Sequence, residues 1–181
     1  MADMGLGGLA AAAQHAQAKG PTPVERWNPP FCGEIDMRIA RDGSWHYLGT
    51  PIGRPALVKL FASILRKDEE GFRLVTPVEK VGIRVDDAPF LAVELEEGLR
   101  FRTNVDDWVE AGPGHELRFE RGAADGVKPY LHVRRGLWAL LARPVFYRLM
   151  ALGEVRGGYF GVPAQDAFFK IAPESEFEGL A

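Results

Sequence analysis

A nine-residue segment that occurs twice, at 54–62 and in degraded form at 143–151, constrains the fold more than any other feature. Both copies open with Arg-Pro, and proline suits the first turn of a helix because its missing N–H has no intrahelical partner there. Apolar residues in and just after the first copy recur at helical spacing and form one stripe: Leu57, Leu60, Phe61, Ile64 and Leu65. The sequence therefore predicts one amphipathic helix at each copy.

The flanks of the two predicted helices also match. A Gly-x-Trp segment precedes each helix, at 43–45 and 136–138, and a glycine-led apolar segment follows each, at 71–77 and 158–163. Self-similarity that extends beyond a single helix is typical of duplicated units. We interpret the chain as two related units that each run hairpin, helix, strand; the alternative is that two Arg-Pro helices arose separately.

Short strands separated by turn residues surround these helices. A hairpin is predicted at 34–48, and pairing Ile39 with Trp45 puts their large side chains on one face. The opposite face then carries Asp36, Arg38 and His46. A second hairpin is predicted from 81–85 and 90–95, around an Asp-Asp-Ala-Pro turn.

Many short strands with two main helices predict an α+β fold, in which mostly antiparallel strands of each unit pack on one main helix. We expect three parts. Residues 1–20 form a disordered or frayed tail with at most a short helix at 9–18, residues 21–80 form an N-terminal α+β unit, and residues 81–181 form a C-terminal α+β unit.

Composition limits the classes of function. The chain has 181 residues, of which 46% are hydrophobic and 26% are charged, a composition that is ordinary for a globular protein. The net charge of -3 gives no whole-protein electrostatic case for nucleic acid or an anionic membrane. The single cysteine, Cys32, excludes an internal disulfide and fits a reducing cytosol. No secretory signal or membrane-spanning run is apparent, so we expect a cytoplasmic protein.

The run Pro-Pro-Phe-Cys-Gly-Glu-Ile-Asp-Met-Arg-Ile at 29–39 carries a resemblance to an uncharacterised bacterial family, domain of unknown function 1285. The resemblance covers essentially all of the chain after the tail and continues through 42–45, 51–54, 57–61, 75–80, 86–90, 103–104 and 129–134. It implies a duplicated two-domain α+β fold, a second domain with some likeness to pleckstrin-homology-type barrels, and a binding site at the domain interface near the cysteine. It implies no established activity.

Cys32 is the sharpest candidate for chemistry. A nucleophilic thiol needs a nearby cation, helix N-terminus or imidazole, whereas the sequence neighbours of Cys32 are acidic. His46 lies too far along its strand, so a base would have to be His115 or His132 from the other unit. The alternatives are a small, buried, inert cysteine and a cysteine that contacts a ligand without catalysis.

Arg54 and Arg143 stand just before the two predicted helices, whose free N–H groups could bind an anion. Positive charge at that end opposes the helix dipole, so the favoured interpretation is that Arg54 pairs with one of four carboxylates: Glu34, Asp36, Glu79 or Asp87. The polar hairpin face is either solvated or, if the other unit covers it, part of a pocket. The full candidate binding set is Cys32, Asp36, Arg38, Arg54, Glu79, Asp87, Asn104, His132 and Arg134.

Between 121 and 156 basic residues outnumber acidic ones and alternate with aromatic residues. Such a stretch could bind an anion or nucleic acid, but amphipathic folding with solvated arginines is the favoured interpretation, because no recognised nucleic-acid motif accompanies the charge. The histidines lack metal-ligand spacing, and no phosphate loop, dinucleotide fingerprint or nucleophile elbow occurs. We therefore expect no metal and no cofactor.

The leading interpretation is a non-enzymatic regulatory module that binds a small ligand or a protein segment in a cleft between its two units, near Cys32. Signal transduction would suit such a module. An enzyme that uses Cys32 as a nucleophile is the first alternative, and an anion or nucleic-acid binder acting through the basic C-terminal unit is the second.

Overall fold

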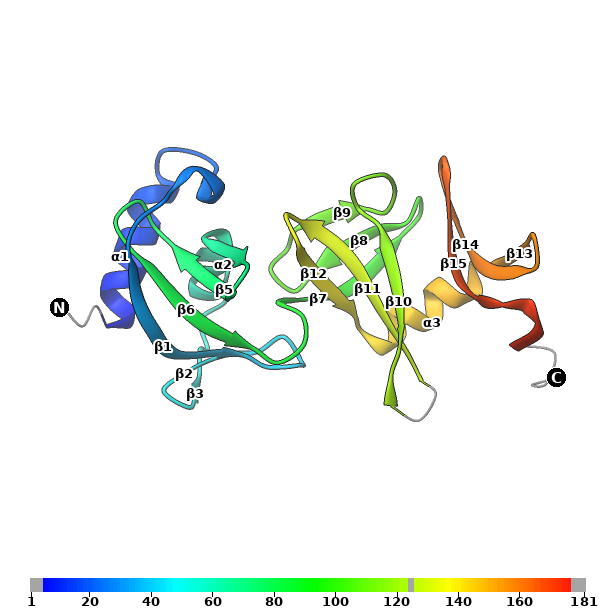
Figure 1. The fold of residues 1–181 in the computed structure, drawn as a ribbon, viewed down its shortest axis with the longest axis horizontal. Coiled ribbons are helices and arrows are strands. Elements are labelled where there is room, and N and C mark those ends of the chain that lie inside the picture. The colour runs from blue at the N-terminus through cyan, green and yellow to red at the C-terminus, as the bar shows by residue number, and fades with distance from the viewer. Residues whose placement is uncertain (1–4, 124–125, 177–181) are drawn as a thin grey trace. The chain divides into compact units, whose positions relative to one another are not determined.

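The computed structural model describes residues 5–123 and 126–176 and divides the chain into two compact units between Pro89 and Phe90. Figure 1 shows their helices and strands in chain order. Each unit is built around its own six-stranded sheet, and the C-terminal unit carries a further sheet of three strands. The predicted two-unit α+β fold is therefore confirmed.

Two helices belong to the N-terminal unit. Helix α1 (Leu6–Gln17) buries Leu9, Ala13 and Ala16 and contacts α2 (Pro55–Ser63), which places Pro55 in its first turn as predicted. A short 3-10 turn, η1 (Val24–Arg26), follows α1. Most of the segment that we expected to be frayed is thus a packed helix, because its small alanines allow close approach to α2; residues 1–4 lie outside the described residues.

The N-terminal sheet has the order β3-β2-β1-β6-β5-β4, and all its pairs are antiparallel except β1 with β6. Its strands are β1 (Phe31–Ile39), β2 (Trp45–Tyr47), β3 (Thr50–Pro51), β4 (Leu65–Asp68), β5 (Gly71–Val75) and β6 (Lys80–Val85). The Trp45 ring stacks on Phe61 of α2, with 6.3 Å between the ring centres. Burial of these aromatic rings fixes the helix against the sheet.

The predicted register of the first hairpin is confirmed, since Ile39 pairs with Trp45 and Arg38 with His46. The predicted second hairpin is wrong. Strand β6 pairs with β1 and β5 of its own unit, and the strand that follows, β7 (Phe90–Glu96), pairs with partners in the C-terminal unit. Because β6 completes the first sheet, the first unit extends to Pro89 and does not end at Lys80, where the sequence placed the boundary.

The C-terminal six-stranded sheet has the order β10-β11-β12-β7-β8-β9 and again contains one parallel pair, β12 with β7. Its other strands are β8 (Arg100–Thr103), β9 (Trp108–Glu110), β10 (Leu117–Arg121), β11 (Val127–Arg134) and β12 (Leu137–Leu141). The inner face of the sheet buries Phe90, Phe101, Leu131 and Leu137. Apolar burial of this kind is the main stabilising contribution to the unit.

Helix α3 (Arg143–Ala151) follows β12 and buries Val145 and Leu149. It leads from the six-stranded sheet to the small antiparallel sheet β13-β14-β15 (Figure 1). The strands of that sheet are β13 (Glu154–Arg156), β14 (Tyr159–Ala164) and β15 (Ala167–Pro173), with the turn η3 (Glu174–Glu176) after them. Only Gly161, Val162 and Ala164 of these three strands are buried.

The two units share an order of elements, but their strands pair differently. In each, a hairpin is followed by a helix and then by three antiparallel strands. In the N-terminal unit the third of these strands returns to pair with β1, whereas in the C-terminal unit the three form a separate sheet. Common ancestry of the units and the pleckstrin-homology likeness therefore stay predictions. Among the described residues, no helix has the length and apolar character needed to span a membrane.

Candidate functional site

The backbone is irregular at Cys32-Gly33. From Phe31 to Glu34 the chain advances three residues while its partner strand advances two, from Lys80 to Gly82, so β1 bulges. Gly33 takes a φ of 101°, which glycine adopts without strain. Bulges are rare between parallel strands and are enriched beside functional sites. The Cys-Gly pair is thus explained by the backbone, and it presents Cys32 on the surface.

The Cys32 thiol contacts backbone. Its Sγ lies 3.5 Å from the carbonyl oxygen of Pro30, and the amide of Lys80 donates to the same oxygen at 3.1 Å. Cys32 and the turn that precedes Lys80 are therefore neighbours. The partner of the thiol is a carbonyl and not the cation or imidazole that activates a nucleophilic cysteine.

Glu79 is the most unusual polar residue of this neighbourhood. Glu79 is only 9% exposed, and its side-chain oxygen Oε1 has no hydrogen-bond partner among the described residues. Burial raises the pKa of Glu79 above its usual range. The backbone of Glu79 is fixed, because its amide donates to the hydroxyl of Thr76 and its carbonyl accepts from the amide of Thr76.

Two large apolar side chains are exposed on residues next to the backbone of Glu79. Phe31 is 50% exposed on β1 and Val78 is 68% exposed in the turn between β5 and β6. We call this part of the N-terminal unit the Cys32 end and define it as Pro30, Phe31, Cys32, Val78 and Glu79. It combines exposed apolar surface with a buried polar atom that has no hydrogen-bond partner in the described part of the chain.

An ion pair borders the Cys32 end. The Arg73 guanidinium, in a residue only 7% exposed, donates to Glu34 at 3.2 Å and lies 4.9 Å from the centre of the Phe31 ring. The Glu34 carboxylate in turn lies against Gly82, where a Cβ would overlap it. Glu34, Gly82 and Arg73 occupy one row across three adjacent strands.

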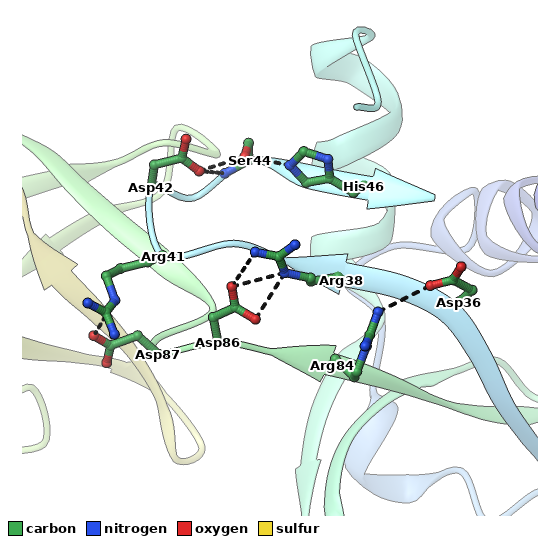
Figure 2. A network of polar contacts seen from close by, with 9 residues as sticks. All are labelled: Asp36, Arg38, Arg41, Asp42, Ser44, His46, Arg84, Asp86 and Asp87. Atoms are coloured by element: carbon green, nitrogen blue, oxygen red, sulfur yellow. Dashed lines mark hydrogen bonds and ion pairs between the residues drawn. The ribbon is translucent and has the colours of Figure 1, made fainter. Parts of the chain in front are cut away.

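Farther along β1 the predicted residues Asp36 and Arg38 belong to the network of charges that Figure 2 shows. Arg38 makes a bidentate contact with Asp86, with its Nη2 2.7 Å from the carboxylate, and Asp36 pairs with Arg84 at 3.3 Å. The Arg38 hydrogen bonds lower the pKa of Asp86. These pairs are exposed, so each contributes little to stability.

The same figure includes a chain of hydrogen bonds across the first turn. The Ser44 hydroxyl lies 2.5 Å from Asp42 and 2.9 Å from Nε2 of His46. Hydrogen bonding from Ser44 lowers the pKa of Asp42. Because the hydroxyl proton is directed at the carboxylate, His46 does not act as its base, and the arrangement is a turn motif and not a nucleophile.

Arg54 occupies the N-cap position of α2 with an extended backbone. The pairing that we favoured for it is not observed, because three of the four candidate acids have other partners: Glu34 with Arg73, Asp36 with Arg84, and Asp87 with Arg41 at 3.9 Å. The fourth, Glu79, leaves its Oε1 without a partner among the described residues.

The remaining predicted residues lie in the C-terminal unit and have structural contacts. Asn104 accepts from the amide of Leu91 through its side chain at 3.0 Å and donates its own amide back at 2.8 Å. Arg134 pairs with Asp107 at 2.6 Å and covers the Phe90 ring. These contacts tie β7 and β11 to the loop after β8.

His132 connects two turns of this unit. Its Nδ1 lies 2.8 Å from the carbonyl oxygen of Gly114, and its Nε2 lies 3.0 Å from the amide nitrogen of Gly136. A carbonyl only accepts and an amide only donates, so Nδ1 carries the hydrogen and the ring is neutral. A histidine that acts as a base for Cys32 would need a ring nitrogen that is not already engaged in a hydrogen bond to the backbone.

The structure thus brings some predicted residues together and separates others. Cys32 and Glu79 share one end of the N-terminal sheet, while Asp36, Arg38 and Asp87 form its charged network. A site shared by these residues with those of the C-terminal unit stays a prediction. Sequence reasoning missed Arg73, Gly82 and Arg84, whose only local signal was an arginine or a glycine in an apolar strand. It also missed Asp86, which it treated only as a turn residue.

Three arginines of the basic stretch of the C-terminal unit have acidic partners. Arg121 pairs with Glu176 at 2.7 Å, Arg134 with Asp107, and Arg156 with Glu154. Within residues 5–123 and 126–176, no group of three His, Cys, Asp or Glu side chains could hold a metal ion.

Comparison with known proteins gives one consistent result. Residues 22–88 match the N-terminal domain of a family described as a domain of unknown function, DUF1285, and residues 89–171 match its C-terminal domain. A crystal structure of a DUF1285 family protein from Silicibacter pomeroyi DSS-3 is 54% identical, covers 94% of this chain and 98% of its own, and superimposes with a TM-score of 0.87.

A second crystal structure, of a DUF1285 family protein from Shewanella baltica OS155, is 33% identical and has a TM-score of 0.50. The similarity covers 62% of this chain and 87% of that one. No curated protein matches.

Proposed function

The chain belongs to the DUF1285 family, and from this premise we propose that it is a non-enzymatic binding module whose N-terminal unit holds an amine-bearing ligand at the Cys32 end. The single observation that carries the proposal is the Glu79 carboxyl, which is buried with Oε1 lacking a partner among the described residues. An unsatisfied buried acceptor costs about 1–3 kcal/mol, and a ligand that donates a hydrogen bond to it recovers part of that cost.

The surroundings of Glu79 specify the chemistry of the ligand. Desolvation is the cause of its raised pKa, and a carboxyl held in that way gains most from a positively charged donor. The exposed side chains of Phe31 and Val78, on residues next to the backbone of Glu79, offer apolar contact at the same end of the sheet. A primary ammonium attached to an apolar chain satisfies both features.

Binding fits the site better than catalysis does. The Cys32 thiol is directed to a backbone carbonyl, and the Ser44 hydroxyl to a carboxylate. A module that holds a ligand without transforming it is suited to regulation, and a role in signal transduction would follow if ligand binding altered a partner of this protein. The ammonium group could come from a free amine or from a lysine side chain of a peptide.

The test uses matched probes on the full chain, followed by amide chemical shifts in NMR spectra. We expect hexylamine to shift the amides of Phe31, Val78 and Glu79, and hexanoate of the same length to leave them unchanged. Replacing Glu79 by leucine should abolish the response, while Glu79→Gln, which keeps an acceptor, should weaken it about tenfold. Equal responses to hexylamine and hexanoate, or none at these three residues, would contradict the proposal.

A second pair of probes distinguishes the source of the amine. An acetylated and amidated Leu-Lys-Leu peptide that binds more tightly than hexylamine would indicate a protein segment, and weaker binding would indicate a small amine. Alkylation of Cys32 with iodoacetamide should block either probe because it adds bulk at the site. The Cys32→Ser variant serves as its control and should bind normally.

A further inference from the structure

Large exposed apolar side chains are concentrated in one short part of the C-terminal unit. Tyr147 is 63% exposed, Leu152 50%, Val155 49% and Tyr159 37%. They lie in α3, directly after it, and in the first two strands of the small sheet. Clusters of this kind on a protein surface mark interaction sites more often than isolated apolar residues do. The small sheet also buries little of its own surface, and three short strands are near the limit of independent stability.

The edge of this sheet is strand β13. It pairs with β14 on one side only, through Glu154 with Gly161, Val155 with Phe160 and Arg156 with Tyr159. All three residues of β13 are exposed. An edge strand offers backbone N–H and C=O groups to an added strand.

The sequence of β13 is complementary to itself. When two copies of Glu-Val-Arg are paired antiparallel about the central valine, Glu154 of one copy stands opposite Arg156 of the other, and the valines face each other. Opposite charges directly across from each other stabilise antiparallel strands, and a two-fold interface requires this kind of self-complementarity. Charged residues of one sign would protect an edge strand from pairing with another strand. Here one acidic and one basic residue flank the valine, and this order favours pairing with a second copy of the same strand.

We propose that β13 pairs with β13 of a second copy of this chain, so that the two small sheets form one continuous sheet of six strands. Val155, 49% exposed at the centre of β13, would be covered in the process. In a single chain Arg156 contacts Glu154 of its own strand. In the paired strands Arg156 of each copy would contact Glu154 of the other copy. The proposal is independent of the ligand site at the Cys32 end.

Charge exchange tests the proposal directly. We expect the full-length protein to be dimeric by multi-angle light scattering. Arg156→Glu puts glutamate opposite glutamate twice, and Glu154→Arg puts arginine opposite arginine twice, so each variant alone should weaken the dimer about ten- to a hundredfold. A mixture of the two variants restores both complementary pairs and should return the dimer mass.

Circular dichroism and urea unfolding of each variant establish that it is folded, as expected for exchanges at exposed positions. The proposal is overturned if the unmodified protein is monomeric throughout the accessible concentration range. It is also overturned if the single variants dimerise as the unmodified protein does, because the copies would then meet through another surface. Failure of the mixture to regain the dimer would exclude antiparallel β13 pairing.

Discussion

The carboxylate of Glu34 lies against the backbone of Gly82 on the neighbouring strand, in the space that a Cβ would occupy. In that position it accepts a hydrogen bond from Arg73, whose residue is only 7% exposed. The missing side chain of Gly82 thus makes room for the partner of a buried guanidinium. A glycine inside a strand often marks such a close approach.

Replacing Gly82 by alanine should displace Glu34 and weaken its contact with Arg73. Glu34 is a flexible, largely exposed side chain that can move away, so we expect a loss of about 1 kcal/mol in the free energy of unfolding and not the larger cost of a backbone clash. Urea unfolding measures the change. In a Glu34→Ala background the same substitution should cost less, and additive effects of the two changes would show that the contact contributes nothing.

Glu79 should make the protein less stable as pH rises. Burial raises its pKa in the folded state, so between the ordinary glutamate pKa and the raised value the folded chain keeps a proton that the unfolded chain has lost. The free energy of unfolding therefore falls through that range. Glu79→Gln should remove this slope and stabilise the protein at neutral pH, as thermal unfolding at a series of pH values would show. An unchanged pH profile in the variant would count against the raised pKa.

The opposite dependence is expected of Asp68. Hydrogen bonds from Arg66, the shortest at 2.6 Å, are the largest cause that lowers the pKa of Asp68, and Lys80 lies 3.5 Å away. Because the pKa of Asp68 is lower in the folded chain than in the unfolded chain, its ionised carboxylate stabilises the fold at pH values above the unfolded-state pKa. This stabilisation is lost as the pH falls through the folded-state pKa. Asp68→Asn should cost about 1–3 kcal/mol at neutral pH and little in acid. An equal cost at both pH values would contradict this assignment.

His132 should be neutral, with its hydrogen on Nδ1, because it donates to Gly114 and accepts from Gly136. Long-range proton–nitrogen NMR spectra report this tautomer directly. His132→Ala removes both hydrogen bonds and should cost about 1–3 kcal/mol, with faster hydrogen exchange at the Gly136 amide. His15→Ala, in helix α1 of the other unit, is a matched control that should leave that amide unchanged. A hydrogen on Nε2 would refute the assignment.

Local patterns predicted the elements whose causes are themselves local. Proline in the first turn and an apolar stripe define α2, and alternation of large apolar residues fixes the pairing of Ile39 with Trp45. The bend at Gly33, directly after Cys32, also follows from nearby residues. In each case the conformational preference depends on residues that lie within a few positions in the chain.

The sequence by itself determined the two helices, the first hairpin and the two-unit α+β organisation. Only the tertiary structure decided that β6 returns to β1, which placed Glu79 beside Cys32 and Gly82 beneath Glu34. Parallel pairing joins residues more than 40 positions apart. The choice of partner strand depends on the total apolar surface that the sheet buries and not on the composition of one segment. Burial without a partner is likewise a property of the assembled unit, so the unusual state of Glu79 could be read only from the fold.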